Sequence, residues 1–340
     1  MNWTTMPGNV SVSCVVPYDE GRIPLLVLYI AVLLVGFPAN LVTIYLTIHK
    51  VLCNNVLAIY LLSLSLSDLT YLLTLPVWAV YVNSSHHWPW SSLACQVTGY
   101  VFFTNMYISI FLLCCISIDR YVAVVYALES RGLRHQRLAA FVTLAIWCVV
   151  GFGHAPVFTM PEVQDVSGEH RCFEPNQSTA TVTGFNYARF SVGFLGPLIV
   201  LIFTNHSILA SVRASASITV HQKQKVRRLA VAVVLLFLIC FGPYHLLLLL
   251  HAITYHFPSL LADCHFEQHV YTPYIISLGL STINSAANPV LYMLSSDNIK
   301  KEFRGCVTGL RSRCCQCCID PSQDVSTKTL NTQVQGTRMD

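Results

Sequence analysis

The chain has 340 residues, of which 54% are hydrophobic and only 11% are charged, and its mean hydropathy is +0.57. A soluble domain usually carries about twice that fraction of charged residues, and the net charge of +4 here is spread unevenly along the chain. The fourteen cysteines are too dispersed for a small disulfide scaffold. These totals exclude an ordinary soluble domain and predict an integral membrane protein.

Seven apolar blocks follow a polar N-terminal segment. Residues 1–23 lack the apolar core of a cleavable signal peptide, so we expect an extracellular tail and a first block that acts as an uncleaved signal anchor. Each block approaches the roughly 20 residues that a membrane helix needs, and backbone polar groups in lipid must be bonded within the helix. We therefore predict an all-α membrane protein, a seven-transmembrane helix bundle over residues 24–294. The predicted spans are 24–49, 55–82, 93–125, 138–158, 185–212, 227–252 and 270–294.

Lysine and arginine predict the orientation of the bundle, because cytoplasmic loops carry an excess of both. Loops on one side hold most of these residues, whereas the opposite loops hold only Arg22 and Arg171 among several acids. The basic side is therefore cytoplasmic and the N-terminus is extracellular, which predicts a multi-pass protein of the plasma membrane. The cytoplasmic basic residues are Lys50, Arg131, Arg134, Arg137, Arg213, Lys223, Lys225, Arg227, Arg228, Lys300, Lys301, Arg304, Arg311 and Arg313.

Two kinds of candidate modification site agree with this orientation. Sequons for N-glycosylation lie on the outer side, at Asn2, Asn9, Asn83 and Asn176. A group of cysteines follows the last span among basic residues, at Cys306, Cys314, Cys315, Cys317 and Cys318. Juxtamembrane cysteines of this kind favour S-palmitoylation, and the alternative is unmodified thiols. A zinc site is disfavoured because no histidine or acid lies nearby to complete it.

The remaining outer-side cysteines are candidates for disulfides, because that compartment is oxidising. They are Cys14, Cys95, Cys172 and Cys264. Four cysteines allow three pairings, and the sequence spacing does not choose among them. On the other side of the membrane, the polar residues 307–340 are predicted to form a disordered cytoplasmic tail.

Polar motifs stand inside or at the ends of three spans. Asp68 is the only acid at mid-depth, where an unpaired charge would cost several kcal/mol and where ionisable groups are functional candidates. The tripeptide Asp-Arg-Tyr at 119–121 lies at the cytoplasmic boundary of the third span. In the seventh span, "NPVLY" at 288–292 contains a proline, which removes one backbone donor and loosens the helix.

With these motifs in order, the chain resembles a rhodopsin-like (class A) G protein-coupled receptor over roughly residues 24–306. The landmarks, one per span, are Asn40 in "GFPAN", Asp68 in "SLSLSD", Arg120 in "DRY", Trp147, Pro197, Pro243 in "CFGPYH" and Asn288 to Tyr292 in "NPVLY". The resemblance implies a receptor, not an enzyme, that couples to a heterotrimeric G protein. It also implies arrestin, receptor kinases and membrane lipid as partners, and no nucleic acid.

The resemblance implies specific pairings and roles for these residues. It pairs Cys95 with Cys172 and leaves Cys14 and Cys264 to join the N-terminal tail to the third outer loop. It also places a short amphipathic helix at 295–306, after the last span. The implied activation-switch residues are Asp119, Arg120, Tyr121, Phe241, Pro243, Pro289 and Tyr292. Phe241 stands where the family commonly has tryptophan.

A pocket for an allosteric sodium ion is a further implication of the resemblance, and this ion is the only cofactor that we expect. The residues that match its lining are Asp68, Asn105, Ser109, Asn284 and Asn288. The alternative is a purely structural polar cluster around the helix breaks.

Stretches such as "TLPVWAVY" at 74–81 and "CFGPYHLLLL" at 240–249 resemble the proton-sensing and lysolipid-linked subfamily of these receptors. Acidic pH is therefore one expected signal, and histidine is the side chain that changes charge between pH 5 and 8. The candidate proton sensors, where outer loops meet span ends, are His86, His87, His170 and His269. The alternative for each is ordinary hydrogen bonding in a loop. Roughly four coupled histidines would supply the about 5.5 kcal/mol that moves a switch from 1:99 to 99:1.

An anionic lipid, such as an oxidised fatty acid or a lysophospholipid, is the other expected signal. Arg189 is the only base well inside the outer half of the bundle, and a guanidinium binds a carboxylate or phosphate bidentately. The alternatives are an internal pair with Glu174 or a side chain that snorkels to the interface. Aromatic residues that could line a cavity around Arg189 are Tyr107, Tyr187, Phe190, Tyr244, His245 and Tyr274.

Other classes of membrane protein fit less well. A transporter would show an internal repeat, a channel would show a pore-lining ring, and an enzyme would show a nucleophile–base pair or a metal cluster. The alternatives within the receptor class are a constitutively active receptor with no physiological agonist and a receptor for a peptide or another small molecule. Asn288 stands where proton-sensing relatives commonly carry an aspartate, so Asp68 lacks a second acid with which to share a proton.

Overall fold

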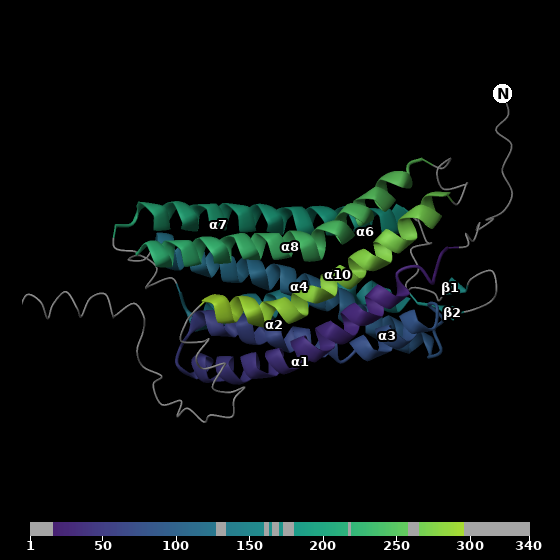
Figure 1. The fold of residues 1–340 in the computed structure, drawn as a ribbon, viewed down its shortest axis with the longest axis horizontal. Coiled ribbons are helices and arrows are strands. Elements are labelled where there is room, and N and C mark those ends of the chain that lie inside the picture. Colours follow the sequence, from purple (N-terminus) through teal and green to yellow (C-terminus); the bar gives the residue numbers. More distant parts are fainter. Residues whose placement is uncertain are drawn as a thin grey trace, which may run out of the picture.

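The computed structural model of the chain describes residues 16–126, 134–159, 163–164, 170–172, 180–216, 219–257 and 265–295. These residues form a bundle of long helices that lie side by side (Figure 1). Six helical units in this part of the chain are long and apolar enough to cross a membrane, and α10 completes the bundle by packing between α1 and α8. The predicted all-α seven-helix bundle is confirmed.

The helical units correspond to the predicted spans in order. The first span is α1 (Arg22–Leu52), the second is α2 (Val56–Leu72) with α3 (Leu75–Asn83), and the third is α4 (Ser92–Val125). The fourth is α5 (Gln136–His154), which ends in the 3₁₀ helix η2 (Ala155–Thr159). The fifth combines α6 (Ala180–Phe190), the π-helix η3 (Ser191–Leu195) and α7 (Gly196–Ala214). The sixth is α8 (Val220–Thr254) and the seventh is α10 (His265–Ser295).

Two predicted spans are interrupted where the sequence places proline. The block at 55–82 is divided between α2 and α3, because Pro76 at the start of α3 has no amide hydrogen to continue the helix. The Tyr71 carbonyl accepts from the Thr74 hydroxyl at 2.7 Å and from the Thr74 amide at 2.8 Å, which closes the end of α2. In the fifth span, η3 ends two residues before Pro197. A π-bulge of this kind often marks a functional site.

Three helices begin at least five residues before their apolar blocks. α6 begins at Ala180, not at 185, α8 begins at Val220, not at 227, and α10 begins at His265, not at 270. The added turns are polar, so the apolar run does not reveal them. At α8 the signal is instead a capping box, in which Thr219 and Gln222 satisfy each other's backbone amides.

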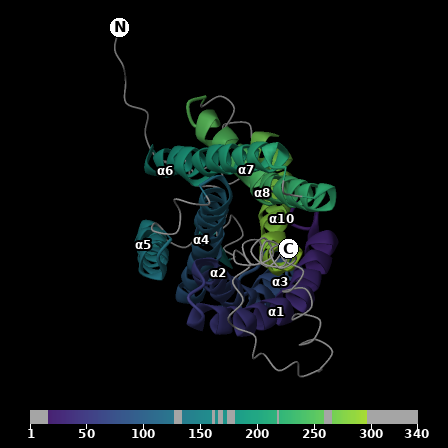
Figure 2. The same ribbon diagram turned by 90° about the vertical axis from the view of Figure 1, so that its left-hand side faces the viewer.

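The third span is the central helix of the bundle. In its most apolar stretch 67% of the residues are buried, against 17% for the fourth span, so α5 presents most of its surface to lipid. Figure 2 shows α5 at the periphery, beside α4. At one end of the bundle, β1 (Val163–Gln164) pairs antiparallel with β2 (His170–Arg171) (Figure 1). This end carries the loops predicted to be extracellular.

Candidate functional site

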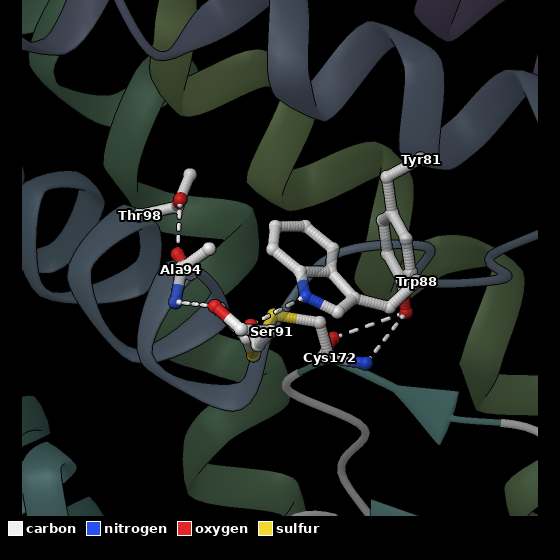
Figure 3. Close-up of a disulfide and its surroundings, with 7 residues drawn as sticks. Tyr81, Trp88, Ser91, Ala94, Thr98 and Cys172 are labelled. Carbon is white, nitrogen blue, oxygen red and sulfur yellow. Dashed lines mark hydrogen bonds between the residues drawn. A yellow bond between two sulfur atoms is a disulfide. The ribbon is translucent and has the colours of Figure 1, made fainter.

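A disulfide between Cys95 and Cys172 joins the start of α4 to the end of β2, with their Cα atoms 5.7 Å apart. The Tyr81 hydroxyl donates to the Cys172 carbonyl at 3.0 Å and accepts from the Cys172 amide at 3.2 Å. The Trp88 indole donates to the Ser91 carbonyl at 3.0 Å beside the disulfide (Figure 3). The second outer loop is therefore fixed to the second and third spans. The other expected pair, Cys14 and Cys264, lies outside the described residues.

His86 is buried in an aromatic cage at the outer end of the second span. Only 1% of its surface is exposed, and its Nδ1 lies 2.9 Å from the Tyr271 hydroxyl of α10. The rings of Tyr18 and Tyr81 lie 5.7 and 5.0 Å from the imidazole. Its Nε2 is buried without a hydrogen-bond partner among the described residues. The cage therefore joins the N-terminal segment to the second and seventh spans.

Burial and a neighbouring positive charge keep His86 neutral. Burial, together with the Arg171 guanidinium, lowers the pKa of His86 to about 4, although the Asp19 carboxylate opposes the change. Arg171 lies over the Tyr18 ring, 4.0 Å from its centroid, and donates to the Ser85 carbonyl. Asp19 accepts a hydrogen bond from the Ser85 hydroxyl at 2.6 Å. At pH 6 to 8 this state of the protein therefore holds an uncharged imidazole.

The other candidate proton sensors do not share this environment. His87, His170 and His269 are exposed, and they lie on the turn after α3, on β2 and on α10 respectively. The structure thus brings only His86 of the four into a buried site. The aromatic partners Tyr18 and Tyr271 were not expected from the sequence, because contacts between the N-terminal segment and the seventh span carry no local signal.

Arg189 lies among aromatic side chains in the outer half of the bundle. Its guanidinium carbon is 5.0 Å from the centroid of the Phe103 ring, a cation–π contact. The hydroxyls of Tyr107, Tyr244 and Tyr274 lie close enough to interact with its charge. Among the described residues, the ion pairs of arginine with carboxylates involve Arg22 and Arg134, and none involves Arg189. Glu174, the alternative internal partner, lies outside the described residues.

Tyr187 and Phe190, which were expected to line a cavity around Arg189, contact other groups instead. The Tyr187 hydroxyl donates to the Ala252 carbonyl at 3.2 Å and ties α6 to α8. The Phe190 ring packs on Phe194 of η3, with centroids 6.0 Å apart. His154 of α5, which was not singled out in the sequence, instead stacks on Tyr107 at 5.1 Å and interacts with the charge of Arg189.

A chain of contacts connects Tyr107, beside Arg189, to Phe241. His245 Nδ1 lies 2.7 Å from the Phe241 carbonyl, and a carbonyl can only accept, so Nδ1 carries the proton. Nε2 therefore accepts from the Tyr107 hydroxyl at 3.2 Å. The Phe194 ring stacks on the imidazole at 4.9 Å. Gly193 allows the Tyr107 ring to lie against η3, because a Cβ at this position would lie 2.4 Å from Tyr107 Cε1.

Asp68 is fully buried and accepts hydrogen bonds on both carboxylate oxygens. Oδ1 accepts from Asn105 Nδ2 at 3.1 Å and from the Ser285 hydroxyl at 2.9 Å, while Oδ2 accepts from Asn288 Nδ2 at 2.9 Å. Asn284 makes no hydrogen bond to Asp68 and lines a small internal cavity nearby. Ser285 takes the place expected for Asn284, because positions 281, 285 and 288 share one face of α10.

The residues around Asp68 fit a small oxygen-ligated cation. The Ser109 hydroxyl and Asn288 Oδ1 are buried without a hydrogen-bond partner in the described part of the chain. Both are oxygen atoms, the ligand type that hard cations prefer. Asn105 bonds to Asp68 and also lines the internal cavity, so the carboxylate and the cavity are adjacent.

At the cytoplasmic end, Asp119 and Arg120 have different environments. Asp119 is buried and forms an ion pair with Arg134, the residue that precedes α5 by two positions, whereas Arg120 is exposed. The Tyr121 hydroxyl donates to that of Tyr126 at 3.4 Å. Tyr292 is buried, and the centroid of its ring lies 6.0 Å from the Lys50 amine. Pro243 and Pro289 lie inside α8 and α10.

Comparison with known proteins agrees with this architecture. Residues 39–292 match the model of the 7 transmembrane receptor (rhodopsin family). The chain belongs to this family. The receptor is therefore a multi-pass protein of the plasma membrane, its family consists of receptors and not of enzymes, and it couples to a G protein. The sequence-based resemblance to class A receptors is confirmed.

Individual relatives narrow the family. The receptor is 44% identical to the mouse "Probable G-protein coupled receptor 132" over 336 residues, and this alignment covers 98% of the receptor and 86% of that relative. It is 36% identical over 296 residues to the human "G-protein coupled receptor 68", and the alignment covers 87% of the receptor and 80% of that relative. It is 29% identical over 282 residues to the human "Lysophosphatidic acid receptor 4", with 81% and 75% covered. The resemblance to the proton-sensing and lysolipid-linked subfamily is confirmed by these relatives.

Of the expected modification sites, the structure describes Asn83, and the others lie outside the described residues. Asn83 lies at the end of α3, and its Oδ1 accepts from Arg22 at 2.9 Å. The sequons at Asn2, Asn9 and Asn176, the cysteine group at 306–318, the amphipathic helix beyond residue 295 and the cytoplasmic tail lie outside the described residues.

Proposed function

We propose that the receptor is activated by an anionic, amphiphilic lipid whose acid group binds Arg189. The observation that carries this proposal is a guanidinium among aromatic side chains with no carboxylate partner among the described residues. A charged group held in a region of low polarity is expensive unless it is paired. An anionic ligand supplies the missing partner.

The pocket suits an acid group joined to a long apolar tail. The guanidinium fork binds a carboxylate or a phosphate through two parallel hydrogen bonds. The Tyr244 hydroxyl is buried beside the guanidinium and offers a further donor. Phe103 and Tyr107 supply apolar surface next to it. One relative is named for lysophosphatidic acid, an anionic lipid, which supports the same class of ligand.

The test is a dose–response curve of G protein activation with an oxidised fatty acid and with a lysophospholipid. Hydrogen bonds to a charged group contribute about 1.5–3 kcal/mol, so Arg189→Ala should lower the potency of the active lipid roughly 10- to 150-fold. Val192→Ala is a matched control, because Val192 lies in η3 and 66% of its surface is exposed. Equal potency on Arg189→Ala and the control would overturn the proposal.

Acidic pH is a second candidate signal, favoured by the burial of His86. Protonation of His86 in this state would place a positive charge beside Arg171 in a closed aromatic cage. Any state that exposes the imidazole is therefore favoured as the pH falls. We propose that acid opens the contact between His86 and Tyr271 and so loosens the outer ends of the second and seventh spans.

A sodium ion near Asp68 is also part of the proposal. Asp68, Asn105 and Ser109, together with Asn288, would hold it, and its charge would stabilise the carboxylate in the present arrangement of spans two, three and seven. Arrestin and receptor kinases are proposed as partners of the cytoplasmic side, on the basis of family membership.

A further inference from the structure

The carboxylate of Asp119 is held from the second cytoplasmic loop. Arg134 Nε donates to Oδ1 and Nη2 donates to Oδ2, each at 2.8 Å, so one guanidinium occupies both oxygens. The side chain of Asp119 is only 6% exposed, and that of Arg134 is 35% exposed. Bidentate, partly buried pairs of this geometry are stronger and more specific than ordinary surface ion pairs.

The segment that carries Arg134 is itself fixed to the bundle. Gln136 Nε2 donates to the Val51 carbonyl at the end of α1 at 2.8 Å. His135 between them is the N-cap residue of α5. The segment that carries Arg134 is therefore held at the end of the first span and at the start of the fourth span.

Arg120 is left without a carboxylate. It follows Asp119 directly on α4, yet both oxygens of Asp119 are taken by Arg134, and no ion pair joins Arg120 to any described carboxylate. Arg120 is exposed at the cytoplasmic end of the bundle. A carboxylate released from Arg134 would find Arg120 within reach, since the charge of Asp119 already acts on the Arg120 guanidinium.

We propose that Arg134 is a positioning residue for G protein coupling. By holding Asp119 in a bidentate ion pair, it keeps Arg120 unpaired and available to the G protein. The proposal rests on the coupling of the receptor to a G protein and is independent of which agonist occupies the outer pocket. Loss of Arg134 frees Asp119 to capture Arg120, and the cytoplasmic site then binds the G protein less well.

The experiment measures the affinity of the purified full-length receptor in bilayer discs for nucleotide-free heterotrimeric G protein. Arg134→Ala should weaken the affinity roughly three- to tenfold, and Arg134→Lys, which keeps the charge but offers one bond, should restore part of the loss. Arg137→Ala is the matched control, because Arg137 lies three residues further along the chain and is exposed in the first turn of α5. It should bind like the unchanged receptor.

A double variant separates positioning from direct contact. With Asp119→Asn in place there is no carboxylate to capture Arg120, so adding Arg134→Ala should produce no further loss. If Arg134→Ala purifies poorly, the same comparison is made with Arg134→Lys, whose smaller loss must also vanish on Asp119→Asn. An unchanged or higher affinity of the single variant, or an equal loss in the Asp119→Asn background, would overturn the proposal.

Discussion

Replacing His86 by asparagine should remove a defined part of the acid response. Asparagine does not titrate between pH 5 and 8, and its short amide can still bond to the Tyr271 hydroxyl. It also tolerates the left-handed backbone conformation of this position, where φ is 60°. The change therefore removes the titration of the site with little disturbance to the cage.

The size of the effect follows from the two environments of the imidazole. In this state burial lowers the pKa of His86 to about 4, and in an exposed state it has its ordinary pKa of about 6.5. Because the folded pKa is lowered, protons bind the exposed state more tightly, and the caged state loses stability as pH falls below about 6.5. The free energy by which protonation favours the exposed state over the caged state is close to zero at pH 8, about 0.8 kcal/mol at pH 6.0 and about 1.4 kcal/mol at pH 5.5. One histidine thus shifts the populations about fourfold at pH 6.0.

The assay is second-messenger output between pH 8.0 and 5.5 at matched surface expression. His86→Asn should reduce the pH-dependent change in the switch equilibrium by about fourfold at pH 6.0. His87→Asn is the control, because His87 is the next residue and is exposed. A full pH response in His86→Asn, or an equal loss in His87→Asn, would refute the argument that burial of His86 makes it the sensor.

Two further predictions concern the interior of the bundle. Gly193→Ala should push Tyr107 away from His245, because its Cβ would lie 2.4 Å from the Tyr107 ring, and the overpacking should cost about 1–3 kcal/mol and lower the Tm by several degrees. Gly184→Ala, where a Cβ meets nothing within 4 Å, should leave the Tm of the purified receptor unchanged, and equal losses would contradict this reasoning. For the sodium site, NaCl should raise the Tm above its value in choline chloride, and Asp68→Asn should abolish that difference; a sodium effect that survives Asp68→Asn would place the ion elsewhere.

The fold and the polar core were largely predictable from the sequence. Long apolar blocks and the distribution of lysine and arginine predict a bundle because lipid allows few other structures. Asn105 and Asn288 were expected near Asp68 and do bond to it. Ser285 was missed in favour of Asn284, because a one-residue difference along α10 rotates a side chain by about 100°, and the prolines at 273 and 289 disturb the helical register.

The contacts that the sequence could not predict join segments far apart in the chain. Tyr271 and His86 are 185 residues apart, and nothing near either of them marks the pair. Arg134 is one of several arginines near the cytoplasmic surface, and only the fold shows that its guanidinium reaches Asp119. The π-helix at 191–195, whose Gly193 packs against Tyr107, has no signal in the composition of the fifth span.

The most direct test of the anionic-lipid proposal is nucleotide exchange by a G protein on the purified receptor in bilayer discs at a fixed pH of 8.0. A lysophosphatidic acid and an oxidised fatty acid are each compared with an uncharged ester of the same chain length. The account predicts that at least one acid activates the receptor, that its uncharged ester does not, and that Arg189→Ala removes the difference. An Arg189→Ala receptor that still distinguishes the active acid from its ester, or an unchanged receptor that responds to the two alike, would contradict it.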